Sequence, residues 1–545
     1  MAILNLSLNN FIVPGLGNYT PEFGTKLDIG KGMSTAQMNN NIMMPFMAQR
    51  PVRIIENSTT TEIEADRNLI FDNSGLTVTL GTAAFAGCKV QVSSSFSSGT
   101  SYVRYARGEG FEVQSVTKGT VITLISDDSG NFSLYERIYN GKVMNATYEP
   151  KGGINVAHNR WCTFAFNAEN RQSIKIKADT HIPLDIVTAG AKERRWFDIE
   201  DDTIIDLSSL IAAAANATST NTGIVKGRNF YIYLVPEDEG VGIAVSCNST
   251  YPNDINADYT ANNTRKIAWF STMCADIDNN LTGSLPAAPG TVSVGATYPV
   301  MPYDDNVSDF YTFYNREVVS VTAGTYYDVL SVKHPLAGFR AGDIIPESVW
   351  CLSFRPIGIG GAMVYAVMTD SAIDVYKQSG TGLNTTSEYG GTVVSTRQWQ
   401  NHQNDFLQVR KSLLSDNEFI AAAIGGNEKT VAAADDADTY KVLHAGGHVD
   451  SLGNAMLSFI GAWETNGAGW EWLNTPSANG GSNFSTYDGQ GAFGQLYGAS
   501  YSLLAGGNRF AGTSCGSRCR GATRPLSDAD AAVGGRGASR VICGA

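Results

Sequence analysis

The C-terminal stretch, residues 505–545, constrains the architecture of this chain more than any other part of the sequence. Two glycine-rich blocks, residues 505–507 and 533–537, bracket a run that is poor in large apolar side chains and rich in Ser, Thr, Asp, Arg and Ala. Such a run has too little apolar surface to offset the entropy lost when it becomes ordered. The rest of the chain must therefore supply a scaffold that displays it.

The overall composition is that of a turn-rich β protein. With 545 residues the chain is too long for one core, and its length predicts about three or four domains. Charged residues make up only 17% while glycine occurs 57 times, which favours strands and turns over helices. The net charge of −13 argues against nucleic acid or an anionic membrane as partner, because both reward clustered Lys and Arg.

The termini and cysteines carry no sign of export or membrane insertion. Residues 1–10 alternate apolar and polar side chains, which predicts a first strand and not a signal peptide. No run of about eighteen apolar residues occurs, so no membrane insertion is expected. The eight cysteines are spread along a chain without a secretory signal, which predicts reduced thiols.

The N-terminal part divides into a docking segment and two β domains. Residues 1–50 are expected to dock on a larger assembly, because the Met-rich piece 33–47 suits adaptable contacts. The alternative is a helix packed on its own domain. Regularly spaced β-type runs and turn signals predict a β-sandwich or barrel over residues 51–145. Residues 146–340 are expected to form a second β domain with a linker, since Gly, Pro, Asn and Asp gather around 276–309.

Residues 341–545 are expected to form an α+β domain, which makes the fold class mainly β and multidomain. A strand is predicted over residues 348–354. The one convincing helix begins at Ser415, whose hydroxyl forms a capping box with the carboxylate of Glu418, and it stops at two glycines, residues 425–426.

Three groups of residues in this domain have both a chemical and a structural interpretation. His444 and His448 have the spacing of metal ligands on a helix, but the glycines between them break the helix. The thiols of Cys515, Cys519 and Cys543 could bind zinc or form a disulfide, although small buried thiols are commoner.

Paired tryptophans form the third group. Trp470 and Trp472 could form a sugar-stacking platform, but paired tryptophans are more often core, and the core interpretation is favoured. Two arginines close to glycines, Arg518 and Arg536, are interpreted as structural staples, because a guanidinium can bond several loop carbonyls at once.

The glycines and arginines of the C-terminal stretch carry a family resemblance. Residues 506–507, 516–518 and 534–537 have the order and spacing of the Gly-Gly, Gly-Ser-Arg and Gly-Ala-Arg-Gly motifs of the phage major tropism determinants and related retroelement-diversified proteins, with Gly535 in place of Ala. Upstream segments agree in order as well. They are residues 264–270, 350–356, 415–423 and 469–473.

This resemblance implies a C-terminal C-type-lectin fold of the formylglycine-generating-enzyme type that binds a receptor and catalyses nothing. In the family, positions between the glycine motifs are diversified by adenine-directed mutagenesis through a diversity-generating retroelement. Ungapped spacing from Gly507 carries these receptor-binding positions onto Asn508, Phe510, Ala511, Gly512, Ser514, Gly521, Thr523, Arg524, Asp528, Asp530, Ala532 and Val533. Arg509 stands where the family often has Trp. No cofactor and no metal are expected.

The resemblance further implies a bacteriophage receptor-binding protein at the tail or fibre tip, made in the cytoplasm of the host bacterium and active in host adsorption. A homotrimer in the virion is implied, which contacts other tail proteins through its N-terminal region and a host surface protein or glycan through its C-terminal domain. Two alternatives remain open. One is a structural virion decoration protein, and the other is an enzyme of the formylglycine-generating or glycan-degrading type.

Overall fold

The computed structural model confirms a mainly β, multidomain chain with an α+β C-terminal part. The structure describes residues 11–13, 17–19, 52–63, 67–84, 86–107, 110–127, 129–139, 142–144, 163–178, 180–188, 191–207, 226–238, 240–287, 292–300, 314–323, 328–433, 440–486 and 495–543. The predicted first strand over 1–10 and the docking piece 33–47 lie outside the described residues.

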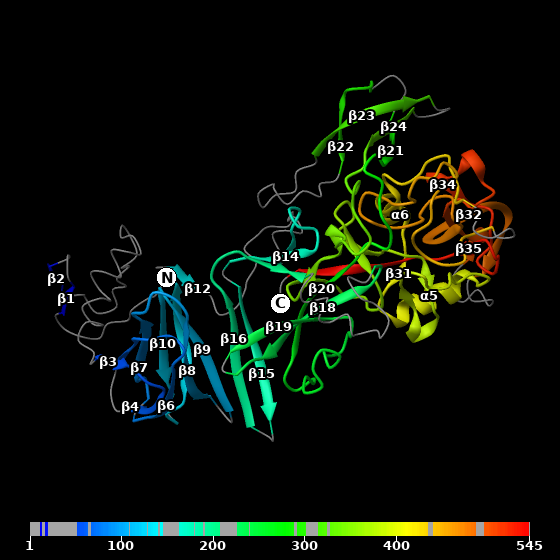
Figure 1. The fold of residues 1–545 in the computed structure, drawn as a ribbon. Helices are drawn as coiled ribbons and strands as arrows, with labels where there is room; N and C mark the ends of the chain where they lie inside the picture. The colour runs from blue at the N-terminus through cyan, green and yellow to red at the C-terminus, as the bar shows by residue number, and fades with distance from the viewer. Residues whose placement is uncertain are drawn as a thin grey trace. The chain divides into compact units, whose positions relative to one another are not determined.

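The chain forms two compact units (Figure 1). Unit 1 comprises Met1–Ala146 and Val187–Trp196, and unit 2 comprises Thr147–Ile186 and Phe197–Ala545. In the part that the structure describes, no helix is both long and apolar enough to span a bilayer.

In unit 1 the strands alternate between two sheets. The first sheet has the order β12-β11-β10-β7-β5-β3. In the second sheet the order is β16-β9-β8-β6-β4, and residues 187–196 of the β15/β16 hairpin belong to unit 1. The strands are β3 (Val52–Ile55), β4 (Thr59–Ile63), β5 (Arg67–Phe71), β6 (Thr77–Ala83), β7 (Lys89–Ser94), β8 (Thr100–Arg107), β9 (Gly110–Thr117), β10 (Thr120–Ser126), β11 (Phe132–Tyr139), β12 (Lys142–Met144), β15 (Thr180–Thr188) and β16 (Ala191–Ile199), preceded by the hairpin β1 (Phe11–Val13) and β2 (Gly17–Tyr19).

Alternating side chains explain the core of unit 1. Buried and less buried residues alternate over Thr77–Leu80 of β6 and Thr100–Ala106 of β8, so that Val78, Leu80, Val103 and Tyr105 face one shared core. Because consecutive strands from β3 to β8 alternate between the sheets, the pairs β3/β5, β5/β7, β4/β6 and β6/β8 are parallel. The predicted runs thus form strands as expected, whereas this parallel pairing has no local sequence signal.

Unit 2 is organised by a sheet in which the C-terminal strand is central. β36 (Gly537–Cys543) lies between β26 (Phe354–Pro356) and β28 (Ser371–Asp374) and also pairs with β31 (Ser412–Leu413). The remaining members of this sheet are β18 (Asn229–Pro236), β19 (Val241–Ser246), β20 (Arg265–Ser271), β25 (Trp350–Cys351) and β27 (Met363–Ala366). Since β20 pairs with β25, the sheet crosses the predicted domain boundary at 340/341.

Four smaller sheets surround this one. Their strands are β13 (Phe164–Phe166), β14 (Ser173–Ile176) and β17 (Thr203–Asp206); β21 (Thr282–Ala287), β24 (Asp328–Lys333), β23 (Tyr314–Thr322) and β22 (Thr297–Val300); β29 (Gln378–Ser379) and β30 (Thr386–Ser387); and β34 (Gly516–Gly521), β33 (Gln495–Gly506), β32 (Trp470–Thr486) and β35 (Val533–Gly534). The predicted linker over 276–309 is therefore wrong in part, because two strands lie within it. β21 pairs with β24, and β22 pairs with β23.

Two helices flank the C-terminal strands (Figure 1). Helix α6 (Asp416–Ala423) begins with the predicted capping box between Ser415 and Glu418. Helix α5 (Trp399–Gln408) was not predicted, because its sequence is largely polar and its N-cap, Gln398, makes no side-chain capping bond. The predicted strand over 348–354 is interrupted as well: a 3₁₀ turn, Pro346–Ser348, precedes β25, and a turn separates β25 from β26.

Candidate binding site

A buried ionic network forms the base of the C-terminal stretch. The Arg536 side chain is fully buried, and its Nε and Nη2 atoms donate to the Glu471 carboxylate at 3.0–3.3 Å. The same guanidinium donates to three backbone carbonyl oxygens, those of Asp374, Val375 and Trp463, at 2.6–2.9 Å. Arg536 is therefore the structural staple that its sequence context predicts, because one side chain fixes three separate segments.

Glu471 is ionised in this network. Burial alone would raise its pKa, but Arg536 and the ammonium of Lys377, 3.1 Å away, outweigh burial and hold the pKa below its ordinary value. Lys377 also donates to the carbonyl oxygen of Gly469 at 2.8 Å. Lys411 and Asp374 form a second buried ion pair. The Asp374 carboxylate also accepts a hydrogen bond from the backbone N–H of Gly537. Charged groups without access to water thus hold the connection between β35 and β36 and the start of β36.

Two glycines of the resemblance motifs have a steric reason to be glycine. Gly506 has a φ of 85°, and a Cβ atom there would overlap the carbonyl oxygen of Thr465. At Gly516, which has a φ of 151°, a Cβ would overlap the carboxylate of Glu428. That carboxylate instead accepts hydrogen bonds from the backbone N–H, at 2.9 Å, and the hydroxyl of Ser517. The Gly-Ser pair therefore makes room for the half-buried Glu428 carboxylate and then binds it.

A second arginine of β34 makes contacts beyond the predicted staple at Arg518. The Arg518 side chain is exposed, and Arg520, two residues further on, is half-buried and also ties β34 to its surroundings. Its guanidinium pairs with Asp416 of α6, lies 4.9 Å from the ring centre of Phe419, and donates to the carbonyl oxygens of Ser517 and Cys519. Side chains two residues apart on a strand point to the same face. Sequence spacing could not show which of the two arginines meets the helix.

The first display loop, residues 508–514, connects β33 to β34. The Asn508 side chain accepts the N–H of Phe510 at 3.2 Å in a local turn, and a 3₁₀ turn, Gly512–Ser514, follows. Below the loop the Cys515 thiol donates to the carbonyl oxygens of Thr430 and Gly512. The loop is thus closed on itself and attached to the scaffold by Cys515, the residue that follows it.

An exposed pair of aromatic side chains lies at this loop. Phe510 is 68% exposed and Tyr440 is 54% exposed, and their ring centres lie 4.7 Å apart. The Arg509 N–H donates to the carbonyl oxygen of Tyr440 at 3.1 Å, which holds the two segments together. Adjacent exposed aromatic side chains are typical of interaction surfaces, because they bury a large area at a low entropic cost. Tyr440 was missed by sequence reasoning, and no local motif marks it.

The second display loop, residues 521–532, joins the two edge strands β34 and β35. The Arg524 guanidinium binds Asp528 and Asp530 at 2.7 Å each, and all three residues are among the predicted binding positions. Asp530 also accepts the N–H of Ala532 at 2.7 Å, and its carbonyl oxygen accepts the N–H of Thr396. One arginine thus bridges two carboxylates and shapes the loop, although each exposed ion pair contributes little stability by itself.

The twelve predicted binding positions are not equally accessible. Phe510, Gly512, Ser514, Thr523 and Arg524 are exposed, and Asn508, Ala511, Gly521, Asp528 and Asp530 are half-buried. Ala532 and Val533 are only 5% and 1% exposed. As a correction, these last two belong to the scaffold, because Val533 packs with Phe406, Leu413, Trp472 and Leu504 in a small core.

The structure places the other candidate residues in structural roles. Trp472 is fully buried and the partly buried Trp470 packs against the same small core, as predicted. His448 pairs with the buried carboxylate of Glu464. Within the described ranges no group of three His, Cys, Asp or Glu side chains is placed to hold a metal ion. Cys515 and Cys519 are free thiols.

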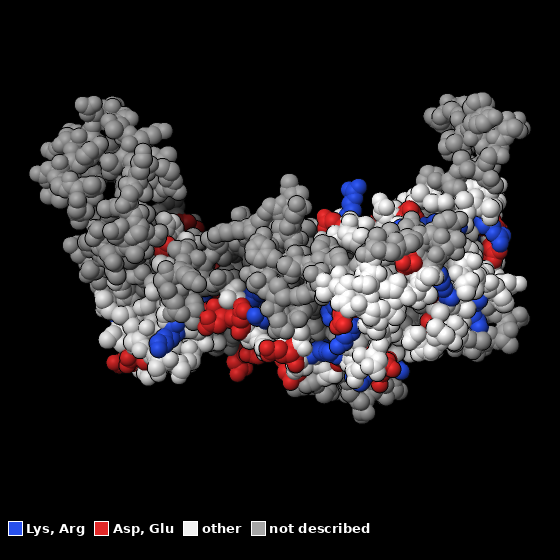
Figure 2. All heavy atoms as spheres, turned by 90° about the horizontal axis from the view of Figure 1, so that it is seen from above, with Lys and Arg blue, Asp and Glu red and all other residues white. Residues whose placement is uncertain are grey.

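The two cysteines next to the display loops are not activated thiols. Burial raises the pKa of the Cys515 thiol to about 12 and also raises the pKa of Cys519, so both thiols are protonated near neutral pH and are poor nucleophiles. Phe510, Tyr440 and the Arg524 triad instead offer aromatic and charged contacts on loops that a buried network supports. On the face drawn in Figure 2, basic side chains occur in small separate groups, which differs from the continuous basic surface that nucleic acids select.

No protein-family model and no curated protein sequence matches the chain. Among solved structures, the chain is similar to the Major Tropism Determinant I1 variant, with 18% identity, a TM-score of 0.46 and coverage of 77% of this chain and 92% of that chain. The P3c variant has 19% identity, a TM-score of 0.45 and the same coverage. The proteins found by this comparison and the family that the C-terminal motifs resemble are the same.

Proposed function

We propose that this chain is a phage receptor-binding protein whose two display loops contact a ligand on the surface of a host bacterium. The main support for the proposal is the difference between the buried charged residues of the C-terminal part and the exposed residues of the two display loops. Arg536, Glu471 and Lys377 are buried and paired, whereas Phe510 and Arg524 are exposed on loops that connect strands of the sheet to which Glu471 belongs. A surface that changes sequence needs such a base, because stability then does not depend on the residues that change.

The proposal includes the context of the virion. The chain is a homotrimer at the tail or fibre tip, attached through its N-terminal region to other tail proteins. Each loop surface is small, and three copies on one particle raise the effective concentration of the surface without new contacts. The ligand is a host surface protein or glycan, and its contact residues include Tyr440 in addition to the exposed loop positions.

Binding of the purified full chain to host cells tests this proposal. We expect Phe510→Ala to weaken binding, because it removes the most exposed aromatic ring of the display loops. Leu383→Ala is the matched control, since Leu383 is 77% exposed, apolar and outside both loops. Equal binding by wild type and both variants would reject the loops as the contact surface. In that case a structural decoration protein becomes the better interpretation.

A further inference from the structure

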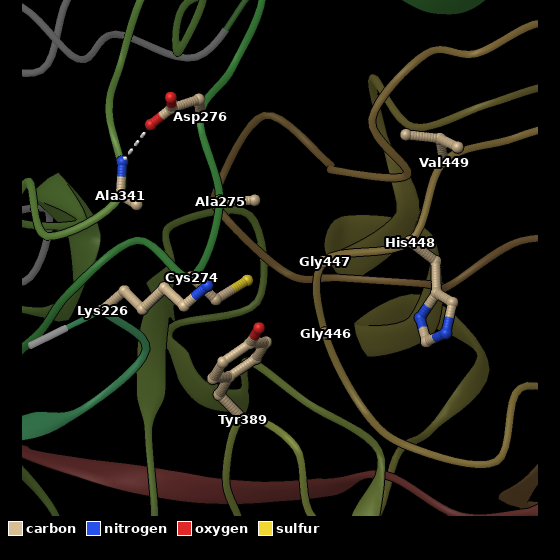
Figure 3. Close-up of a pocket in the computed structure, with 10 residues that line it drawn as sticks. All are labelled: Lys226, Cys274, Ala275, Asp276, Ala341, Tyr389, Gly446, Gly447, His448 and Val449. Carbon is tan, nitrogen blue, oxygen red and sulfur yellow. Dashed lines mark hydrogen bonds between the residues drawn. The ribbon is translucent and has the colours of Figure 1, made fainter.

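A polar pocket in unit 2 lies outside the display loops. Its volume is about 530 Å³, within the range of small-molecule sites. Figure 3 shows the residues that line it, which come from five separate stretches of the chain: Lys226, residues 274–276, Ala341, Tyr389 and residues 446–449. The two glycines of the His444 to His448 motif form one wall, so the motif that suggested a metal site instead leaves bare backbone beside a cavity.

One side of the pocket offers hydrogen-bond donors. Lys226 makes no ion pair among the described residues, and its ammonium lies 5.7 Å from the centre of the Tyr389 ring. In Figure 3 the Lys226 side chain extends towards Cys274, and the Tyr389 hydroxyl points to the same region. Burial raises the pKa of the Cys274 thiol far above its ordinary value, so the thiol is neutral and leaves the charge of Lys226 uncompensated.

Another side of the pocket offers an acceptor. One carboxylate oxygen of Asp276 accepts the N–H of Ala341 at 2.9 Å, which fixes the side chain in place (Figure 3). Its other oxygen has no hydrogen bond to a described residue and is available to a ligand. His448 adds little, because its ring is turned towards Glu464 and away from the side chains of Lys226, Cys274 and Tyr389.

We propose that this pocket binds a saccharide unit through its hydroxyl groups. A simple anion would be attracted by Lys226 but repelled by Asp276, and a simple cation would be attracted by Asp276 but repelled by Lys226. A sugar hydroxyl accepts a hydrogen bond from an ammonium and donates one to a carboxylate, so a ring that carries several hydroxyls satisfies both sides at once.

Saturation-transfer NMR with the purified full chain tests the site. The probes are glucose, galactose, N-acetylglucosamine and galacturonic acid at millimolar concentration. We expect at least one probe to bind, and Lys226→Met and Asp276→Asn each to weaken that binding at least about tenfold. Asn at 276 keeps an oxygen that accepts the N–H of Ala341. Lys333→Met and Asp258→Asn are the matched controls, since both residues are exposed and lie outside the pocket.

Each contrary outcome has a defined meaning. Absence of binding by all four sugars would overturn the proposal, as would binding that persists in both pocket variants while their thermal unfolding matches wild type. Binding of galacturonic acid alone, strengthened by Asp276→Asn, would mean that Lys226 holds an anion and would overturn the assignment to hydroxyl groups. Because the readout is direct sugar binding, failure here leaves the proposed role of the display loops untouched.

Discussion

Arg536 and Glu471 face each other in the interior of unit 2, both fully buried and joined by hydrogen bonds of 3.0–3.3 Å. Removal of one partner leaves a buried charge with incomplete compensation, which typically costs about 3–5 kcal/mol. We therefore expect Arg536→Met to lower the free energy of unfolding of unit 2 by that amount. Urea unfolding followed by tryptophan fluorescence measures this, because Trp196 is the one tryptophan of the eight that lies in unit 1.

Arg540→Met is the control for this substitution. Arg540 lies on the same strand, β36, but its side chain is exposed, so its loss is expected to change stability by no more than about 0.5 kcal/mol. Similar effects of the two substitutions would contradict the role of Arg536 as the base of the display loops.

The second prediction separates backbone strain from steric overlap at a motif glycine. Gly506 and Gly453 have nearly equal φ angles, 85° and 84°, but only Gly506 is crowded: its added Cβ would meet Thr465, whereas the added Cβ of Gly453 has no neighbour within 4 Å. Alanine at either position pays the cost of a left-handed backbone, about 1–2 kcal/mol. We expect Gly506→Ala to be more destabilising than Gly453→Ala in the same urea experiment. Equal losses would show that close packing under the first loop does not matter.

The third prediction concerns pH. Burial lowers the pKa of His334 to about 3 and that of His402 to about 4. Below the ordinary histidine pKa of about 6.5 the unfolded chain therefore binds protons that the folded chain does not. The free energy of unfolding should fall as the pH is lowered from about 6.5 towards 4, by up to about 1.4 kcal/mol per pH unit for each histidine.

Urea midpoints at pH 7 and pH 5 measure this dependence. His334→Gln should reduce the difference between the two midpoints, because glutamine does not titrate. An unchanged difference would mean that His334 is not a source of the acid sensitivity.

The fourth prediction concerns the aromatic pair. Tyr440 and Phe510 should act together in ligand binding, because their rings are 4.7 Å apart and a backbone bond joins their segments. A double-mutant cycle on cell binding with Tyr440→Ala and Phe510→Ala should give a coupling of about 0.5–1.5 kcal/mol. Strictly additive losses would indicate two independent contacts.

Much of the fold was predictable because local signals and the final structure agree. The capping box at Ser415 satisfies free N–H groups of one helix turn, and this needs only neighbouring residues. The same is true of the alternating strands of unit 1. Helix α5 escaped prediction because tertiary contacts of buried residues such as Phe406 support a polar segment that lacks a side-chain cap.

The proposed binding positions could be placed on one stretch of chain from the sequence, but the burial of each position could not be predicted. The motif glycines could be recognised from the sequence pattern, and they stand where another segment approaches the backbone closely. The burial of a binding position, in contrast, depends on which distant segment of the chain packs against it. Val533 is buried in a core that includes Trp472. Phe510 is exposed and its ring contacts that of Tyr440, which lies seventy positions away in the sequence. Neither contact leaves a trace in local sequence, since it depends on long-range packing.

Adsorption of phage particles tests the central claim most directly. Particles would carry Phe510→Ala together with Thr523→Tyr, both at exposed loop positions, and would be compared with particles that carry the exposed control Leu383→Ala. Ala532 is unsuitable for such a test because its side chain is buried. We predict that the adsorption rate to the host falls for the loop variant and stays at the wild-type value for the control. Wild-type adsorption by properly folded loop-variant particles would contradict the proposal that these loops bind the receptor.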